Sequence, residues 1–269
     1  MKEGFASARG HKMFYRSVGS GRPVVFIHAG VADSRMWVPQ LESVPDGFRF
    51  LAVDQRGYGK TPIGEEVFGS DRDVLSILDF FRLEKAVLAG CSVGGGVAID
   101  VAIRAPERID GLVLVGANSP GFEPPDGYYE SPQWPDAVKA FEAGDFERVA
   151  RLDAEMWVAG YGRTIEQVDP GAVKLLIEMD QVALRYENLR ERLQEVDINA
   201  RTERIGSIGC PTLVVVGEYD LPDIRAAADD LAKKLSNDPA VVIPDAAHLP
   251  GLEQPAAFNH ALFDFLSRI

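Results

Sequence analysis

Short, uniformly apolar runs recur along this chain and constrain its fold more than any other feature. They are rich in Val, Ile, Leu and Phe and do not alternate polar with apolar residues, so they predict strands buried on both faces. Such strands are typical of parallel sheets. The runs cover residues 23–28, 50–54, 86–90, 112–116, 212–217 and 240–243.

Helical patterns fill the intervals between these runs, at residues 70–82, 93–104, 223–234 and 256–267. Alternating strands and helices predict an α/β fold: a doubly wound, mainly parallel sheet with helices on both faces. Residues 11–18 are a candidate outer antiparallel hairpin. A chain of 269 residues fits one main domain of this kind with an insertion.

The alternation breaks between residues 119 and 204. This stretch has no convincing buried strand and is rich in Glu, Arg and aromatic residues. It predicts a helical cap inserted between core segments 1–118 and 205–269. A long helix is expected over residues 171–196, with an apolar stripe that favours packing over ligand contact. The Pro- and Gly-rich residues 119–135 predict a loop that leaves the core.

The net charge excludes one class of partner. A formal charge of −13 at pH 7 argues against nucleic acid, because phosphate contacts need clustered Lys and Arg. We interpret this charge as an aid to solubility rather than an attraction for cationic substrates. No apolar run is long enough to span a membrane and the first residues lack a signal sequence, so a cytoplasmic protein is expected, as a monomer or homodimer.

The segment from Gly90 to Gly95 reads Gly-Cys-Ser-Val-Gly-Gly and joins a predicted strand to a predicted helix. This G-x-S-x-G pattern, in this context, predicts a sharp turn that exposes the Ser92 hydroxyl above the sheet edge. The helix N-terminus below offers free N–H groups to a developing negative charge. The alternative is a glycine-rich turn with an incidental serine, in a chain that has 26 glycines.

A serine hydroxyl needs a base to remove its proton, and the chain has 4 histidines. His248 follows the last predicted strand, on a loop at the carboxyl edge of the sheet where ligands bind in open α/β folds. His11, His28 and His260 are interpreted as structural or surface residues. A loop histidine without a partner is the alternative for His248.

The histidine needs a carboxylate to hold its tautomer and stabilise the imidazolium. Glu218, Asp220 and Asp223 all follow the penultimate predicted strand, beside the strand that leads to His248. We select Asp220, since Glu218 is close to the strand end and Asp223 is better placed to cap the next helix. The resulting chain order is Ser, Asp, His, which is one of the known orders for such a triad.

Two backbone amides are the candidate oxyanion hole. One is the N–H of Val93, the residue after the nucleophile, and the other is the N–H of Gly30, in the loop after the first buried strand. An ordinary turn is the alternative for residues 28–30. Residues 54–61 also follow a strand and are interpreted as a structural turn.

Taken together, these residues resemble the α/β-hydrolase fold family. The resemblance runs from about Val24 to the C-terminus, interrupted by the expected cap. One departure is Ala29, where the family usually has glycine, which leaves open which amide faces the oxyanion. The four segments that carry the resemblance are the HGx-like loop 28–30, the DxRGxG turn 54–59, the nucleophile elbow 90–95 and the acid-bearing turn 217–220.

The resemblance implies a serine hydrolase that needs no cofactor or metal. A serine elbow argues against the haloalkane dehalogenase and epoxide hydrolase branches, whose elbows carry aspartate. Residues 34–37 and the short cap look similar to the enol-lactonase and carboxylesterase branch. The expected substrate is therefore a small apolar ester or lactone. Two rivals remain: a carbon–carbon bond hydrolase with the same triad, and a non-catalytic receptor for a small ligand.

Five large side chains are candidates to line the substrate pocket. Each has core packing as its alternative. They are Met36 and Trp37 from the first loop, and Trp134, Trp157 and Tyr161 from the cap.

Overall fold

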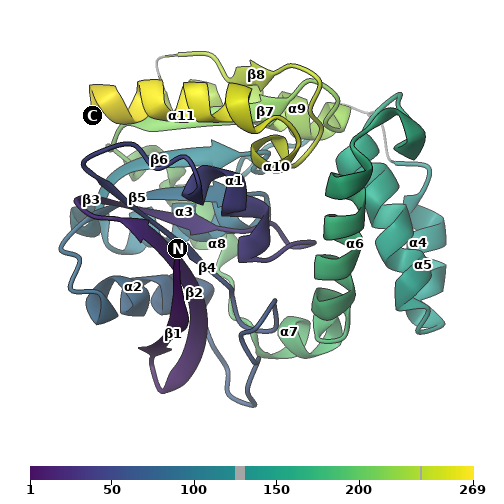
Figure 1. Ribbon diagram of the computed structural model, residues 1–269, viewed down its shortest axis with the longest axis horizontal. Coiled ribbons are helices and arrows are strands. Elements are labelled where there is room, and N and C mark those ends of the chain that lie inside the picture. The colour runs from purple at the N-terminus through teal and green to yellow at the C-terminus, as the bar shows by residue number, and fades with distance from the viewer. Residues whose placement is uncertain (125–130, 237) are drawn as a thin grey trace.

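The computed structural model describes residues 1–124, 131–236 and 238–269. They form an α/β fold around one sheet of eight strands in the order β1-β2-β4-β3-β5-β6-β7-β8. The strands from β4 to β8 in this order are parallel to one another, while β2 runs antiparallel to β4 and β1 antiparallel to β2. The predicted fold class is confirmed. Residues 11–18, predicted as an outer hairpin, form only one of its two strands, β2, which pairs with β1 (Figure 1).

Strands β3 to β7 match five of the apolar runs because both of their faces are buried. Val25 and Ile27 pack into one core cluster, whereas their neighbours Val24 and Phe26 pack into another on the opposite face. The bounds are β1 Lys2–Ala8, β2 His11–Gly19, β3 Arg22–Ile27, β4 Phe48–Val53, β5 Ala86–Cys91, β6 Ile109–Val115, β7 Thr212–Gly217 and β8 Val241–Ile243.

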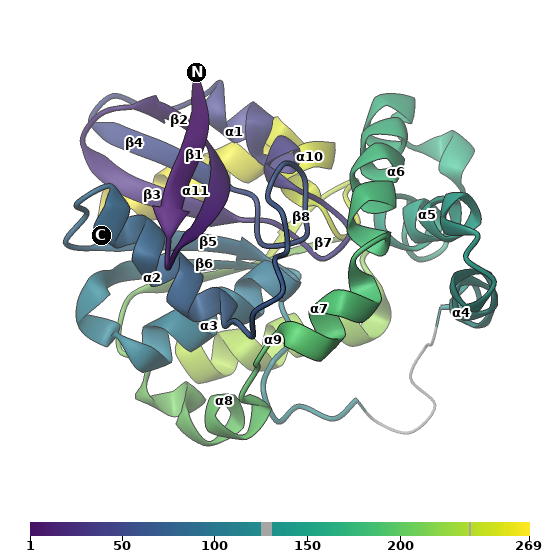
Figure 2. The same cartoon turned by 90° about the horizontal axis from the view of Figure 1, so that it is seen from below.

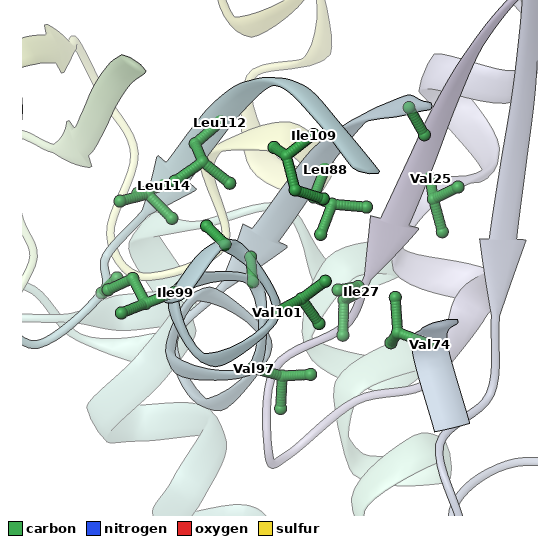
Figure 3. Close-up of a cluster of buried hydrophobic side chains, with 14 of the residues drawn as sticks. Val25, Ile27, Val74, Leu88, Val97, Ile99, Val101, Ile109, Leu112 and Leu114 are labelled. Atoms are coloured by element: carbon green, nitrogen blue, oxygen red, sulfur yellow. The ribbon is translucent and has the colours of Figure 1, made fainter. Parts of the chain in front are cut away.

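Helices cover both faces of the sheet. The first core cluster takes side chains from α2, α3 and α9. Figure 3 shows Val97 and Val101 of α3 on the side of this helix that faces Ile27 of β3. Among the helices over the sheet, α1 and α11 contribute to the second cluster, which also includes residues 154, 172, 176 and 179. The bounds of the helices over the sheet are α1 Val38–Leu41, α2 Ser70–Phe80, α3 Val93–Arg104, α9 Pro222–Leu235, α10 Pro250–Glu253 and α11 Pro255–Arg268.

A helical group stands beside this core. Figure 1 shows α4, α5 and α6 together at one end of the sheet, with α7 below them. In Figure 2, α8 lies apart from the group and close to α3, and Arg201 of α8 forms an ion pair with Asp100 of α3. The bounds are α4 Trp134–Glu142, α5 Phe146–Ala154, α6 Pro170–Leu184, α7 Glu187–Leu193 and α8 Ile198–Arg204.

This arrangement supports a division that we propose: a core of residues 1–118 and 205–269, and a cap of residues 119–204 whose final helix packs on the core. The loop predicted over residues 119–135 includes residues 125–130, which lie outside the described part of the chain.

The single helix predicted over residues 171–196 is wrong, because the chain breaks into α6 and α7 at Arg185 and Tyr186. Arg190 of α7 donates from Nη1 to the Ala183 carbonyl at 2.7 Å and to the Gly57 carbonyl at 3.1 Å. The first bond supplies a side-chain donor near the end of α6, where carbonyl groups lack intrahelical partners.

Candidate active site

The strand order creates a crevice at the carboxyl edge of the sheet. β3 lies at the centre, with β4 on one side and β5 on the other. The loops that leave β3 and β5 are therefore adjacent, and in open α/β sheets ligands bind where the connections diverge in this way. These two loops carry Gly30 and Ser92.

Ser92 lies between β5 and α3 with φ 52° and ψ −116°, a backbone conformation that residues other than glycine avoid. Its backbone is held on both sides: its N–H donates to the Val115 carbonyl at 2.8 Å and its carbonyl accepts from the Gly96 N–H at 3.1 Å. A Cβ at Gly94 would lie 2.4 Å from the Ile27 carbonyl oxygen, so the sharp turn needs glycine there. The local geometry is that of a nucleophile elbow.

His248 and Asp220 form a buried pair. The Nδ1 of His248 lies 2.9 and 3.0 Å from the two carboxylate oxygens of Asp220, and both side chains are almost fully buried. An acceptor on that side assigns the proton to Nδ1, which leaves Nε2 as the basic nitrogen. The other two acids that follow β7 lie elsewhere: Glu218 is exposed and accepts from the Asp245 N–H, and Asp223 is in the first turn of α9.

Gly116 makes room for this pair. It has φ +52°, and a Cβ there would lie 3.0 Å from ring atoms of His248 and 3.2 Å from Asp220 Oδ2. Burial opposes the charged imidazolium, but the Asp220 charge and hydrogen bond outweigh it and raise the pKa of His248. The pair is therefore arranged to stabilise a proton taken up by His248.

The loop around His248 is clamped by Glu253, a side chain that the sequence did not single out. One carboxylate oxygen of Glu253 accepts from the Ala247 N–H and the other from the Leu249 N–H, each at 2.8 Å. Burial raises the pKa of Glu253 to about 7, against the effect of these two bonds. The only sequence signal was an acid shortly after the candidate base.

The cap also contacts His248 directly. Its backbone N–H donates to the Trp157 carbonyl at 3.1 Å, and the two rings lie 4.6 Å apart between centroids. Next to this contact, Arg163 donates to the Asp245 carbonyl and lies 3.6 Å from Glu253. The base loop and the Trp157 segment therefore form one junction.

Gly30 and Val93 lie next to each other across the crevice. A Cβ at Gly30 would come within 3.1 Å of Val93 Cγ2, and Val93 is the first residue of α3, so its N–H has no acceptor within the helix. The N–H of Ala29 is directed to the sulfur of Met36, at 3.5 Å. Of the two loop amides, this geometry favours Gly30 to face the crevice.

His28 and the turn after β4 hold this loop. The Nδ1–H of His28 donates to the Ala29 carbonyl at 2.8 Å, and its Nε2 accepts from the Gln55 N–H at 2.9 Å. Burial lowers the pKa of His28, so the ring is neutral and structural. Arg56 anchors the turn through two hydrogen bonds to buried Asp73, at 2.6 and 2.7 Å.

Ser92, Val93, Gly30 and His248 line a common cavity of about 430 Å³ between core and cap. Apolar and aromatic side chains make up most of its wall, and Tyr58 from the structural turn contributes as well. The remaining lining residues are Val31, Trp134, Ala137, Val138, Phe141, Val149, Asp153, Trp157, Asp180, Leu184, Glu187 and Glu191.

The five predicted pocket residues do not share one environment. Trp134 and Trp157 line the cavity. Met36 and Trp37 are fully buried in the core cluster instead, with Trp37 packed between Phe26 and Phe258, so the packing alternative describes them. Tyr161 lies outside the lining, and its N–H donates to the Tyr219 carbonyl.

Two cap carboxyl groups in the cavity wall were not predicted. Asp153 and Asp180 come from α5 and α6, have 7% and 1% of their surface exposed, and hydrogen bond to each other. Burial raises the pKa of Asp153 to about 6; burial and the neighbouring Asp153 charge raise that of Asp180 well above its usual range. Nothing local marks them, because their meeting depends on how two cap helices pack.

Within the described residues, no group of three or more His, Cys, Asp or Glu side chains is placed to hold a metal ion. In the same part of the chain, every helix is too short or too polar to cross a membrane.

The chain is similar to known proteins in sequence and in structure. The family described as the alpha/beta hydrolase fold matches residues 22–255. The AB hydrolase superfamily protein YisY from Bacillus subtilis is 30% identical to this chain over 230 residues, which cover 83% of this chain and 82% of YisY. A pimeloyl-[acyl-carrier protein] methyl ester esterase from Pectobacterium carotovorum is 28% identical over 262 residues, 94% and 98% of the two chains. Among solved structures, an esterase from Exiguobacterium antarcticum superposes with a TM-score of 0.77 at 23% identity, covering 98% of each chain.

Proposed function

This chain belongs to the alpha/beta hydrolase fold family, and we propose from its crevice that it is a serine hydrolase acting on a small carboxylic ester or lactone. In this proposal Ser92 is the nucleophile, His248 the general base and Asp220 the acid that orients the histidine. The observation that carries the proposal is the buried His248–Asp220 pair, lining the same cavity as a serine with φ 52° at a helix N-terminus.

The proposed reaction has two stages. Ser92 Oγ attacks the carbonyl carbon while His248 Nε2 takes the hydroxyl proton and then passes it to the leaving alcohol oxygen, which gives an acyl-enzyme. A water molecule, deprotonated by the same nitrogen, then attacks the acyl carbon and releases the acid and Ser92. The oxyanion of each tetrahedral intermediate accepts hydrogen bonds from the N–H groups of Gly30 and Val93.

The cavity wall favours a substrate with an apolar portion. Val138, Phe141, Val149 and Leu184 of the cap line it together with Val31 of the core, and burying apolar substrate surface against them is favourable. Carboxylic esters and lactones place a planar carbonyl at the serine and leave the rest of the molecule to this wall.

The test combines covalent labelling with turnover. Three proteins are incubated with a fluorophosphonate and assayed on short p-nitrophenyl esters and on lactones: the wild type, Ser92→Ala and the control Ser207→Ala. The control alters a solvent-exposed serine of the core segment 205–269. We expect labelling and turnover in the wild type and control, and neither in Ser92→Ala. Labelling without ester or lactone turnover would favour the carbon–carbon hydrolase or receptor alternatives. Turnover that survives in Ser92→Ala would refute the proposal.

A further inference from the structure

Apart from His248 and Tyr58, the ionisable side chains that line the cavity are all carboxylic acids. They are Asp153, Asp180, Glu187 and Glu191, and no Lys or Arg belongs to the described lining. A cavity with this balance favours positive over negative ligand groups. A cluster of acids can also be a solvated surface, so the burial and partners of each one decide its meaning.

The Asp153–Asp180 pair is the buried part of this cluster. Its mutual hydrogen bond requires a shared proton, since a carboxylate can only accept. Apart from that proton, no N–H or O–H group of the described residues donates to Asp180 Oδ2, which is shielded from solvent. Buried polar atoms are almost always paired in native proteins. With one shared proton between two buried carboxyl groups and no Lys or Arg of the described residues hydrogen-bonded to either, the pair lacks a counter-charge in the cavity wall, which indicates a cationic ligand.

The nearby guanidinium does not fill this role. Arg190 donates from Nη1 to the carbonyls of Gly57 and Ala183, pairs through Nη2 with Glu187, and lies over the Tyr58 ring at 4.1 Å. Its charge is thus paired with Glu187, and none of its N–H groups donates to Asp180 Oδ2.

Aromatic rings connect the acid pair to the reacting centre. The Trp157 indole N–H, the only donor of that side chain, hydrogen bonds to Asp153, while the Trp157 ring packs on His248 at 4.6 Å. Tyr58, Trp134 and Phe141 add further rings to the same wall. Carboxylates combined with aromatic faces form a favourable environment for an alkylammonium group, through hydrogen bonds and cation–π contacts.

We propose, on the basis of the hydrolase function proposed above, that the Asp153–Asp180 pair binds a protonated amine carried by the ester or lactone substrate. The ammonium N–H groups donate to carboxylate oxygens of this pair, beside the Trp157 ring that packs on His248. A purely alkyl tail at this place would cover the charged pair without supplying a counter-charge, which is costly. The cavity therefore selects substrates that are apolar along their length and cationic at the end.

The experiment compares isosteric substrates that differ in one charged group. On the acyl side, the p-nitrophenyl ester of ε-aminocaproic acid is compared with p-nitrophenyl heptanoate. On the alcohol side, dimethylaminoethyl butyrate is compared with isoamyl butyrate. We expect the cationic member to have a kcat/KM about 10- to 100-fold higher on one of the two sides, which is the range for a hydrogen bond to a charged group.

Asp180→Asn tests the residue assignment. An asparagine amide can still donate to Asp153, so the contact between α5 and α6 is kept while the charge is removed. The variant should lose the preference for the cationic ester and gain activity on the neutral one, because the neutral tail no longer meets a charged pair. A general packing defect would lower both rates. Glu142→Gln, which removes a charge from an exposed position on α4 outside the cavity lining, should leave the preference intact.

The outcomes separate this inference from the proposed function. Ser92-dependent hydrolysis without a cationic preference on either side, or a preference that survives in Asp180→Asn, overturns the inference and leaves the hydrolase function standing. If no ester is hydrolysed, calorimetric titration with butylammonium chloride and with butanol decides the matter. Binding of the amine alone, weakened in Asp180→Asn, supports the inference, and equal or absent binding overturns it.

Discussion

Glu253→Gln is the substitution whose effects can be worked out furthest from the structure. Gln has the shape of a protonated Glu, so the variant removes the buried charge and keeps the volume. The folded pKa of Glu253 is about 7, and the ordinary value is 4.5. Since one pKa unit corresponds to ~1.4 kcal/mol, the charged form costs about 3 kcal/mol in the folded protein.

The direction in which stability changes with pH follows from the raised pKa of Glu253. Below the unfolded value of 4.5 both states are protonated, and between 4.5 and about 7 the folded state holds the extra proton. Wild-type stability from this group therefore falls as pH rises, and the whole cost is present above about pH 7. We expect Glu253→Gln to gain about 3 kcal/mol over the wild type on going from about pH 4 to about pH 8, measured by urea unfolding.

The same substitution should lower activity. Either the Ala247 or the Leu249 N–H loses its carboxylate acceptor and faces an amide NH₂ instead. The resulting shift of the base loop should lower kcat/KM about tenfold. Loss of the Glu253 charge also lowers the pKa of His248, so the acid limb of kcat/KM should move to lower pH. Glu218→Gln, which alters an exposed acid that accepts from the Asp245 N–H in the same loop, is the control and should change neither profile. A stability difference that does not vary with pH would refute the reasoning.

Three further predictions concern the proposed triad. Ser92→Gly should be more stable than Ser92→Ala by about 1 kcal/mol in thermal or urea unfolding, because only glycine adopts φ 52° without strain. Neither variant should turn over substrate. Equal stability of the two variants would contradict strain at the elbow. Gly116→Ala should reduce kcat/KM at least about tenfold, since its Cβ would lie 3.0 Å from the His248 ring and displace it; a fully active variant would show that the ring position is not critical. The acid limb of the wild-type kcat/KM profile should have its midpoint above pH 6.5, because the raised pKa of His248 keeps the base protonated to higher pH. In Asp220→Asn the acid limb of the remaining activity should lie at a lower pH than in the wild type. A wild-type midpoint below pH 6.5 would contradict the assignment of His248 as the base.

The features that the sequence predicted well are carried by local signals. β5, Ser92 and α3 lie within one short segment, in which apolar strand, glycine turn and helix follow one another. The choice of Asp220, whose role stays a prediction, also rested on local order, as an acid just after a buried strand; the structure places it beside His248. Uniform apolar character marked strands buried on both faces, because polar residues on either face would have faced the core.

The features that it missed depend on contacts between distant segments. Met36 and Trp37 have the size and chemistry of pocket residues, and only the packing of α11 against the first loop shows that Trp37 is covered by Phe258. The break between α6 and α7 has no proline or glycine to announce it, and Arg190 contacts both sides of it. Asp153 and Asp180 are ordinary acids of two helices until those helices meet.

The junction between Trp157 and His248 has a consequence for protein engineering. Because the His248 N–H donates to a cap carbonyl and its ring packs on a cap ring, a chimera that exchanges the whole cap with a relative would also replace part of the support of the proposed base. Exchanging α4 and the first turns of α5 alone would alter Trp134, Phe141 and Val149 of the wall and leave residues 153–163 in place. The natural crossover point for changing substrate preference in this scaffold thus lies inside the cap, within α5, rather than at the cap's ends.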